Sequence, residues 1–299
     1  MLEKLQKRLG EGKVKVQEPM AAHTTFRIGG PADFYVMPQT PQEIAEVIRL
    51  CREENCPYFI LGNGSNLLVG DRGYRGVVIQ LYKNFDGISI EGTKVTAKAG
   101  AMLVRVAKEA GKMGLAGLEF ASGIPGTIGG AMVMNAGAYG GEMKDVVTSV
   151  TVLTKDGEVK ILSAEEMKFR YRGSVIDEEG FIVLECTMEL QQGDPEAIKA
   201  RMDELAVQRK TKQPVEFPSA GSTFKRPEGY FAGKLIMDAG LRGYRVGGAQ
   251  VSEKHCGFVI NAGGATAADV MRLMKDVSDR VQEQFGVRLE PEVKRIGEF

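Results

Sequence analysis

A short loop in this sequence has residue types and spacing that suit binding of an anion. Its residues are Gly62, Asn63, Gly64, Ser65 and Asn66, and an apolar run stands on either side of it. Two glycines one residue apart allow backbone conformations that are closed to residues with a Cβ. Successive backbone N–H groups in such a loop form an anion-binding nest. The loop therefore suits a diphosphate, and a tight turn between two strands is the alternative.

Two familiar phosphate-binding loops do not match this stretch. The Walker loop needs a Lys after its second Gly, before a helix, and no Lys follows here. The dinucleotide fingerprint needs a third Gly three residues after the second, where this sequence has Leu67. The residues that follow read as a strand, which predicts a strand–loop–strand cradle.

A second glycine-rich element runs from Ala121 to Ala131 and continues to Gly141. It holds more glycines than a connection between elements needs, and glycine lets the backbone approach a ligand closely. Contact with a ligand is the favoured interpretation, and a packing loop is the alternative.

The sequence Gly221-Ser222-Thr223-Phe224-Lys225-Arg226 is the most specific candidate outside the glycine loops. A Ser held by a Gly and followed by two cations suits donation of a proton or hydrogen bond to an anionic substrate. A nucleophilic Ser is disfavoured, because the elbow motif G-x-S-x-G is absent and neither histidine is adjacent in sequence. The alternative is a turn Ser with solvated cations.

Charged pairs with a spacing of two residues occur twice. Arg170 and Arg172 would share a face if their stretch is extended, and two guanidinium groups could clamp a carboxylate or phosphate. Glu290 and Glu292 have the same spacing around a proline. A carboxylate near a reacting substrate can act as an acid, a base or an electrostatic stabiliser. The alternatives are surface cations and a solvated strand end.

The elements that must position these residues are short. Thr40, Pro41 and Glu43 predict the start of a helix with a capping box, and Asp156-Gly157 predicts a hairpin turn. Thr266 and Asp269 predict a second capping box, and Ser163 with Glu166 a third, at the start of a short helix. A helix from Asp194-Pro195 carries Ile198, Met202, Leu205 and Ala206 inward and ends in the basic stretch 209–212, near which we expect a domain boundary.

Composition excludes several classes of protein. The 299 residues carry 39 Lys+Arg and 39 Asp+Glu, so no global basic field points to nucleic acid or an anionic membrane. Neither a signal-peptide core near the N-terminus nor an apolar run of membrane-spanning length is evident. The four cysteines form no CxxC pair and no zinc pattern with the two histidines. Free thiols in a reducing cytoplasm and no metal site are therefore expected.

Taken in order along the chain, these motifs resemble those of the UDP-N-acetylenolpyruvoylglucosamine reductases, flavoenzymes of peptidoglycan precursor synthesis. The resemblance covers nearly the whole chain. It rests on six stretches: 23–30 (HTTFRIGG), 62–66 (GNGSN), 122–130 (SGIPGTIGG), 171–174 (YRGS), 221–225 (GSTFK) and 289–293 (LEPEV). The chain is similar to the shorter variant of the family, and Arg226 departs from it, since many relatives have Asn there.

The resemblance implies an α+β protein with the vanillyl-alcohol-oxidase-like FAD-binding fold of two α/β subdomains plus a separate substrate-binding domain. We expect the subdomains at 1–85 and 86–205, the substrate domain at 206–287, and a C-terminal segment, 288–299, that returns to the active site. FAD is expected to bind non-covalently through both glycine loops. The implied cofactor-binding residues are Gly62, Asn63, Gly64, Ser65, Asn66, Ser122, Gly123, Pro125, Gly126, Thr127, Gly129 and Gly130.

The resemblance also implies a reaction: NADPH-dependent reduction of an enolpyruvyl UDP-sugar in the cytoplasm. Ser222 would be the proton donor, with Arg172 and Glu292 as its catalytic companions. The implied residues of the UDP-sugar site are Tyr139, Tyr171, Lys212, Lys225 and Arg226. The alternatives are another flavin oxidase of the same fold, which often attaches its flavin through His or Cys, and a non-enzymatic module that binds a UDP-sugar or flavin.

Overall fold

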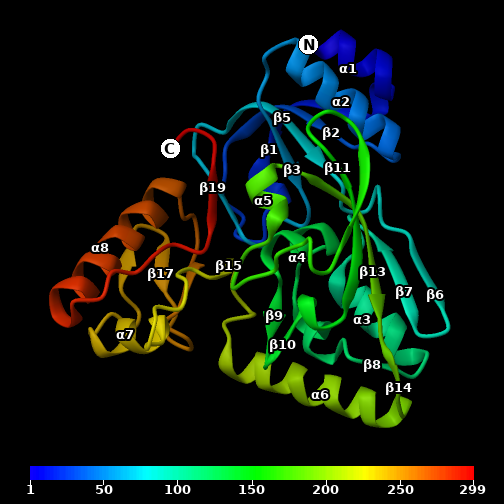
Figure 1. Ribbon diagram of the computed structural model, residues 1–299. Coiled ribbons are helices and arrows are strands. Elements are labelled where there is room, and N and C mark those ends of the chain that lie inside the picture. The colour runs from blue at the N-terminus through cyan, green and yellow to red at the C-terminus, as the bar shows by residue number, and fades with distance from the viewer. The chain divides into compact units, whose positions relative to one another are not determined.

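The computed structural model describes residues 1–299, and the chain forms two compact units, whose elements are labelled in Figure 1. Unit 1 contains Met1–Lys15, Tyr35–Asn63 and Val77–Gln208, and unit 2 contains Val16–Phe34, Gly64–Gly76 and Arg209–Phe299. Each unit is thus built from segments far apart in sequence. The first glycine loop contains one of the points where the chain passes from unit 1 to unit 2, between Asn63 and Gly64.

The first sheet has the strand order β1-β2-β5-β3. Its strands are β1 (Val14–Pro19), β2 (Pro31–Val36), β5 (Tyr74–Gln80) and β3 (Tyr58–Leu61), and β3 runs parallel to β5. Helix α1 spans Leu2–Leu9 and α2 spans Pro41–Glu53. The Thr40 hydroxyl accepts the Glu43 N–H, which confirms the predicted start of α2, but the Glu43 carboxylate accepts the N–H of Gln39, and the predicted capping box with Thr40 is not closed.

A second, five-stranded sheet lies in unit 1, with the order β12-β11-β13-β7-β6. Its strands are β6 (Ile88–Glu91), β7 (Lys94–Lys98), β11 (Val147–Leu153), β12 (Val159–Ser163) and β13 (Ile182–Glu189), and every pairing is antiparallel. The hairpin of β11 and β12 turns at Asp156-Gly157, as predicted, and Gly157 has φ +85°. Glycine tolerates this left-handed conformation without steric cost.

The helices of unit 1 beyond α2 are α3 (Leu103–Lys112), α4 (Ile128–Met134) and α5 (Val175–Glu179). Helix α6 (Pro195–Lys212) begins in unit 1 and ends in unit 2. Two short antiparallel pairs complete unit 1: β8 (Leu115–Ala116) with β14 (Gln191–Gln192), and β9 (Gly137–Ala138) with β10 (Gly141–Glu142).

Unit 2 holds a four-stranded antiparallel sheet, β15-β18-β17-β16. The strands are β15 (Ser219–Ser222), β16 (Arg245–Val246), β17 (Ala249–Val251) and β18 (Phe258–Asn261), and the helices are α7 (Ala232–Asp238) and α8 (Ala267–Phe285). Strand β4 (Leu67–Val69) pairs in parallel with β19 (Lys294–Ile296). The predicted capping box of Thr266 and Asp269 is confirmed at the start of α8.

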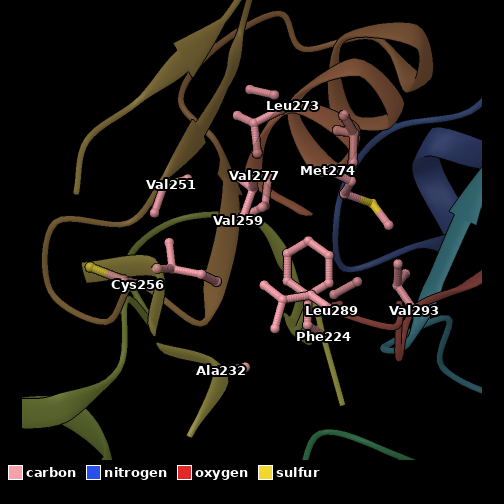
Figure 2. Close-up of a cluster of buried hydrophobic side chains, with 14 of the residues drawn as sticks. Phe224, Ala232, Val251, Cys256, Val259, Leu273, Met274, Val277, Leu289 and Val293 are labelled. Atoms are coloured by element: carbon pink, nitrogen blue, oxygen red, sulfur yellow. The ribbon is translucent and has the colours of Figure 1, made fainter. Parts of the chain in front are cut away.

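The core of unit 2 anchors two of the candidate segments. Figure 2 shows Phe224, Leu289 and Val293 among the same buried side chains as Leu273 and Val277 of α8. Phe224 lies two residues after Ser222, and Val293 directly follows Glu292. Burying such side chains contributes roughly 1.5–3 kcal/mol each, so the positions of Ser222 and Glu292 are fixed by core packing next to them.

Two expectations about local structure are wrong. Ser163 and Glu166 exchange the hydrogen bonds of a capping box, but residues 164–168 form turns and no helix follows. Ala206 was expected to face inward, but it is exposed, and the buried residues of α6 are Ile198 and Leu205. None of the helices has both the length and the apolar character that crossing a bilayer requires.

The four cysteines are free thiols, as expected. Burial raises the pKa of the Cys51 thiol to about 12, with a smaller contribution from the nearby Cys56. Burial also raises the pKa of Cys186 and Cys256. These thiols are therefore protonated at neutral pH and serve as small packing groups.

Candidate flavin and substrate site

In unit 1 the first glycine loop touches the second. A Cβ on Gly62 would lie 2.4 Å from Oγ1 of Thr127, so only glycine fits at this position. The Asn63 side chain donates a hydrogen bond of 2.6 Å from Nδ2 to the carbonyl oxygen of Pro125. Two segments about sixty residues apart thus meet at residues that were predicted to hold one cofactor.

In unit 2 the same loop rests against the segment 23–25. Gly64 has φ +61°, and a Cβ there would lie 2.2 Å from the carbonyl oxygen of His23. The carbonyl oxygen of Gly64 accepts the Thr25 N–H at 3.2 Å. The conformation and the close approach of the backbone both require glycine at this position.

The backbone N–H groups of Asn63, Gly64 and Ser65 donate no hydrogen bond within the protein. Three successive amide donors on a glycine-containing loop form the kind of nest that binds phosphate oxygens. A diphosphate therefore fits this cradle. The predicted strand–loop–strand arrangement is confirmed, since β3 enters the loop and β4 leaves it.

Residues of the second loop differ in whether their hydrogen-bonding groups and the space beside them remain available to a ligand. The Gly129 N–H donates to the carbonyl oxygen of Ala99 at 2.8 Å, and the Ser122 hydroxyl donates to the carbonyl oxygen of Glu119 at 2.8 Å. The buried Thr127 caps α4 and accepts the Gly130 N–H. By contrast, a Cβ on Gly130 would meet only Thr127 Oγ1, at 3.7 Å, so the space beside Gly130 is otherwise open.

Ser222 and Glu292 lie on neighbouring segments of unit 2. The pairing of Phe224 with Pro291 is an isolated antiparallel bridge, and the Glu292 N–H donates to the carbonyl oxygen of Thr223 at 2.8 Å. Ser222 ends β15 opposite Phe258, after a register shift in which Gly221 has φ +75°. Bulges of this kind re-aim side chains and are frequent next to active sites. Both Ser222 and Glu292 are half-buried.

His255 does not form a nucleophilic pair with Ser222. Its Nδ1 accepts the Gly257 N–H at 3.1 Å, and its ring packs edge-on against Phe258 with the centroids 5.1 Å apart. Burial lowers the pKa of His255, which keeps the ring neutral. No hydrogen bond joins the imidazole to the Ser222 hydroxyl, consistent with a serine that donates and does not attack.

The first glycine loop is linked to both of these segments within unit 2. Asn66 donates from Nδ2 to the carbonyl oxygen of Glu292 at 3.2 Å, and the Lys294 N–H donates to the carbonyl oxygen of Asn66. The Thr25 hydroxyl donates to the carbonyl oxygen of Ser219, at the start of β15, at 2.7 Å. Thr25 lies in the motif 23–30, but no residue pattern in the sequence indicates this contact.

Arg170 and Arg172 do not share a face, because the stretch that carries them is not extended. Residues 170–173 form a tight turn closed by reciprocal backbone hydrogen bonds between Arg170 and Gly173. Arg172 has φ +55° within this turn, so the two side chains are directed differently. Arg170 forms an ion pair of 2.7 Å with Glu178, whereas the guanidinium of Arg172 lies 5.4 Å from the ring centre of Tyr171.

The residues predicted for the UDP-sugar site are exposed. Tyr139 and Gly140, with φ +53° and +89°, form the two-residue turn between β9 and β10. In unit 2, Lys225 bonds Glu290 at 3.3 Å, and the guanidinium of Arg226 lies 4.0 Å from the ring centre of Phe231. Lys212 ends α6. In unit 2 the three cations suit the phosphate groups of a sugar nucleotide.

Comparison with known proteins agrees with this chemistry. The family model "UDP-N-acetylenolpyruvoylglucosamine reductase, C-terminal domain" matches residues 213–296, and the model "FAD binding domain" matches residues 32–163. Curated UDP-N-acetylenolpyruvoylglucosamine reductases of Agathobacter rectalis and Clostridioides difficile are 56% and 54% identical. These alignments cover 94% and 97% of this chain and 93% and 95% of the relatives.

A solved structure supports the same assignment. The crystal structure of the UDP-N-acetylenolpyruvylglucosamine reductase of Thermus caldophilus matches with a TM-score of 0.81 at 38% identity, covering 95% of this chain and 98% of that one. Together with the FAD-binding model, this match confirms the predicted fold class. The chain therefore belongs to the UDP-N-acetylenolpyruvoylglucosamine reductase family.

Proposed function

We propose that this protein reduces UDP-N-acetylglucosamine enolpyruvate to UDP-N-acetylmuramate with NADPH and bound FAD. The observation that carries the proposal is the 56% identity, over 94% of the chain, to a relative that bears the name of this reductase. The meeting of the two glycine loops at Gly62 and Thr127 supports it at the level of residues.

FAD, when bound, supplies a hydride that originates from NADPH. The three amide donors of Asn63, Gly64 and Ser65 bind the diphosphate, and the second loop, residues 122–130, lines the cofactor. Attachment is non-covalent. His23 is the only histidine in the first half of the chain, and its Nε2 lies 2.8 Å from Glu18 Oε1.

Ser222 delivers a proton to the carbon next to the substrate carboxylate. A serine hydroxyl is a weak acid in water, so this step requires a strongly basic carbon and a positioned donor. The bulge at Gly221 and the neighbouring core residue Phe224 hold the hydroxyl in place. Glu292, carried on the adjoining segment, donates a hydrogen bond to the charge that develops on the carboxylate when its own carboxyl is protonated, and opposes that charge when it is ionised.

Arg172 binds the substrate carboxylate and stabilises the same developing charge, which is most effective where water is excluded. Lys212, Lys225 and Arg226 bind the diphosphate and uridine, and Tyr139 and Tyr171 cover the sugar. Lys225 is held by Glu290 until the anionic substrate competes for it. These roles place substrate recognition on exposed cations and catalysis on half-buried groups.

We assign cofactor binding and substrate binding to different domains. Residues 1–85 and 86–205 form the FAD-binding subdomains, 206–287 form the substrate-binding domain, and 288–299 return to the active site. The family-model matches at 32–163 and 213–296 support a division between the FAD-binding and substrate-binding parts near residue 206, although residues 16–34 and 64–76 belong to the same compact unit as residues 209–299. Because UDP-sugars and NADPH are cytoplasmic metabolites, we place the protein in the cytoplasm.

The direct test follows the visible absorbance of the bound flavin without oxygen. The purified protein is expected to be yellow, to bleach with NADPH, and to regain colour when the enolpyruvyl UDP-sugar is added. Acid denaturation is expected to release the flavin. Recovery of colour with oxygen but not with the UDP-sugar would instead identify a flavin oxidase, and a colourless protein that binds the UDP-sugar would identify a binding module.

NADPH and the UDP-sugar are expected to take turns at one site, because the sequence shows no separate nicotinamide-binding domain. Initial rates measured against each substrate at several fixed levels of the other should then give parallel double-reciprocal lines. Lines that intersect would show that both substrates bind before either reacts.

A further inference from the structure

Asn135 is a buried polar residue to which the proposed reaction gives no role. It is only 2% exposed and follows α4 in the left-handed conformation, with φ +43° and ψ +58°. Asn is one of the few residues other than Gly that tolerate this conformation. A buried amide is retained at little cost only where its hydrogen bonds are satisfied.

The side chain of Asn135 joins three segments of unit 1. Its Oδ1 accepts the Lys144 N–H at 3.0 Å, and its Nδ2 donates to Glu142 Oε2 at 2.8 Å. The same Nδ2 also donates to the carbonyl oxygen of Arg170 at 3.3 Å. Asn135 therefore ties the end of α4 to the hairpin that carries Tyr139 and to the turn that carries Arg172.

The turn at 170–173 needs such support. Arg172 is held at φ +55°, a strained conformation for a residue other than glycine that persists only where the surrounding structure imposes it. The reciprocal bonds of Arg170 and Gly173 close the turn but do not attach it to the rest of unit 1. The Asn135 bond attaches the carbonyl oxygen of Arg170 to the end of α4, and the ion pair of Arg170 with Glu178 attaches the turn to α5.

The carboxylate of Glu142 interacts with Asn135, Lys144 and Arg172. Its carboxylate bonds Lys144 Nζ at 2.8 Å as well as Asn135, and it caps the short 3₁₀ helix 143–145. The hydrogen bond from Lys144 has the largest effect on the pKa of Glu142 and lowers it. The Asn135 bond and the positive charges of Lys144 and Arg172 lower this pKa further, whereas burial raises it. Glu142 is thus an anion at neutral pH whose field reaches Arg172.

We propose that Asn135, together with Glu142, is a positioning residue that fixes the turn and the guanidinium of Arg172 for the charge-stabilising step. The expected effect on flavin reoxidation rests on the proposed function, whereas the expected effect on the position of Arg172 does not. It predicts a residue that touches neither cofactor nor substrate and that nevertheless governs one half-reaction.

The test is Asn135→Gly, which keeps the left-handed conformation accessible and removes all three side-chain bonds. Flavin reduction by NADPH is expected to stay within about threefold of wild type. Flavin reoxidation by the enolpyruvyl UDP-sugar is expected to slow by about 10–100-fold, the scale of a 1 Å misplacement of a catalytic group. Asn55→Gly is the matched control, because Asn55 also follows a helix at φ +48° and is exposed.

A double-mutant cycle separates positioning from a general structural role. In an Arg172→Ala background, Asn135→Gly is expected to change reoxidation by less than about threefold, because the group it positions is gone. An effect that persists undiminished in that background would overturn the inference. So would an equal slowing of both half-reactions.

A readout independent of turnover keeps the two proposals distinguishable. The ¹⁵Nε signal of Arg172 in the FAD-bound protein, assigned by its loss in Arg172→Lys, is expected to shift in Asn135→Gly and to stay unchanged in Asn55→Gly. An unchanged signal in Asn135→Gly would overturn the positioning role. If Asn135→Gly shifted the signal but the wild-type protein were not reoxidised by the UDP-sugar, the proposed function alone would be overturned.

Discussion

Ser222→Ala is expected to slow flavin reoxidation by the enolpyruvyl UDP-sugar by about 10²–10⁴-fold, the usual contribution of a positioned proton donor. Reduction of the flavin by NADPH involves no proton from Ser222, so that rate should stay within about threefold of wild type. Anaerobic stopped-flow absorbance of the bound flavin measures the two half-reactions separately. The substitution removes one hydroxyl that makes no hydrogen bond within the protein, so folding stability should change little.

Ser219→Ala is the matched control for this prediction. Ser219 begins the same strand, β15, and its backbone oxygen, not its hydroxyl, accepts the bond from Thr25. Both half-reactions should remain within about threefold of wild type in this variant. If Ser222→Ala slowed reduction and reoxidation equally, the serine would be a part of the binding site and not the proton donor.

The sequence predicted elements correctly where the stabilising interactions join residues a few positions apart. The bonds of Thr40 with Glu43 and of Thr266 with Asp269 span three residues, and both capped helices are present as predicted. The Asp156-Gly157 turn is also determined by the residues within it. The capping bonds of Ser163 and Glu166 formed without a helix, which shows that a cap alone does not supply the packing that most helices need.

The geometry of the candidate site depended on contacts that sequence spacing does not contain. Ser222 and Glu292 are neighbours because Phe224 pairs with Pro291, sixty-seven positions later in the chain. The sequence left open whether the stretch around Arg172 is extended, and the closed turn with the bond from Asn135 to Arg170 holds Arg172 at positive φ. The order of the motifs identified the family, and long-range pairing determined which side chains meet.

Gly64→Ala is expected to weaken flavin binding strongly and to destabilise the protein. Two costs add at this position. A left-handed conformation costs a residue with a Cβ about 1–2 kcal/mol, and overpacking against fixed atoms costs about 1–3 kcal/mol more. The atoms in question are backbone atoms, the carbonyl oxygen of His23 at 2.2 Å and Cα of Thr24 at 2.9 Å, which cannot rotate away.

The effect on flavin should exceed the effect on folding. Any shift of the backbone that relieves the clash also moves the amide N–H groups of Asn63, Gly64 and Ser65, which form the proposed diphosphate nest. Since each 1.4 kcal/mol lost changes affinity about tenfold, loss of two such donor contacts at about 1.5–3 kcal/mol each would weaken FAD binding by at least about 100-fold. Fluorescence titration of the flavin-free protein with FAD measures this change.

Gly92→Ala separates the two costs. Gly92 has the same φ, +61°, and a Cβ there would meet nothing within 4 Å. This control is expected to lose about 1–2 kcal/mol of unfolding free energy and to bind FAD as wild type does. Denaturant unfolding of the flavin-free variants gives the stability difference without the contribution of bound cofactor. If Gly64→Ala matched Gly92→Ala in both stability and FAD affinity, the close approach of the loop to His23 would have no part in holding the cofactor.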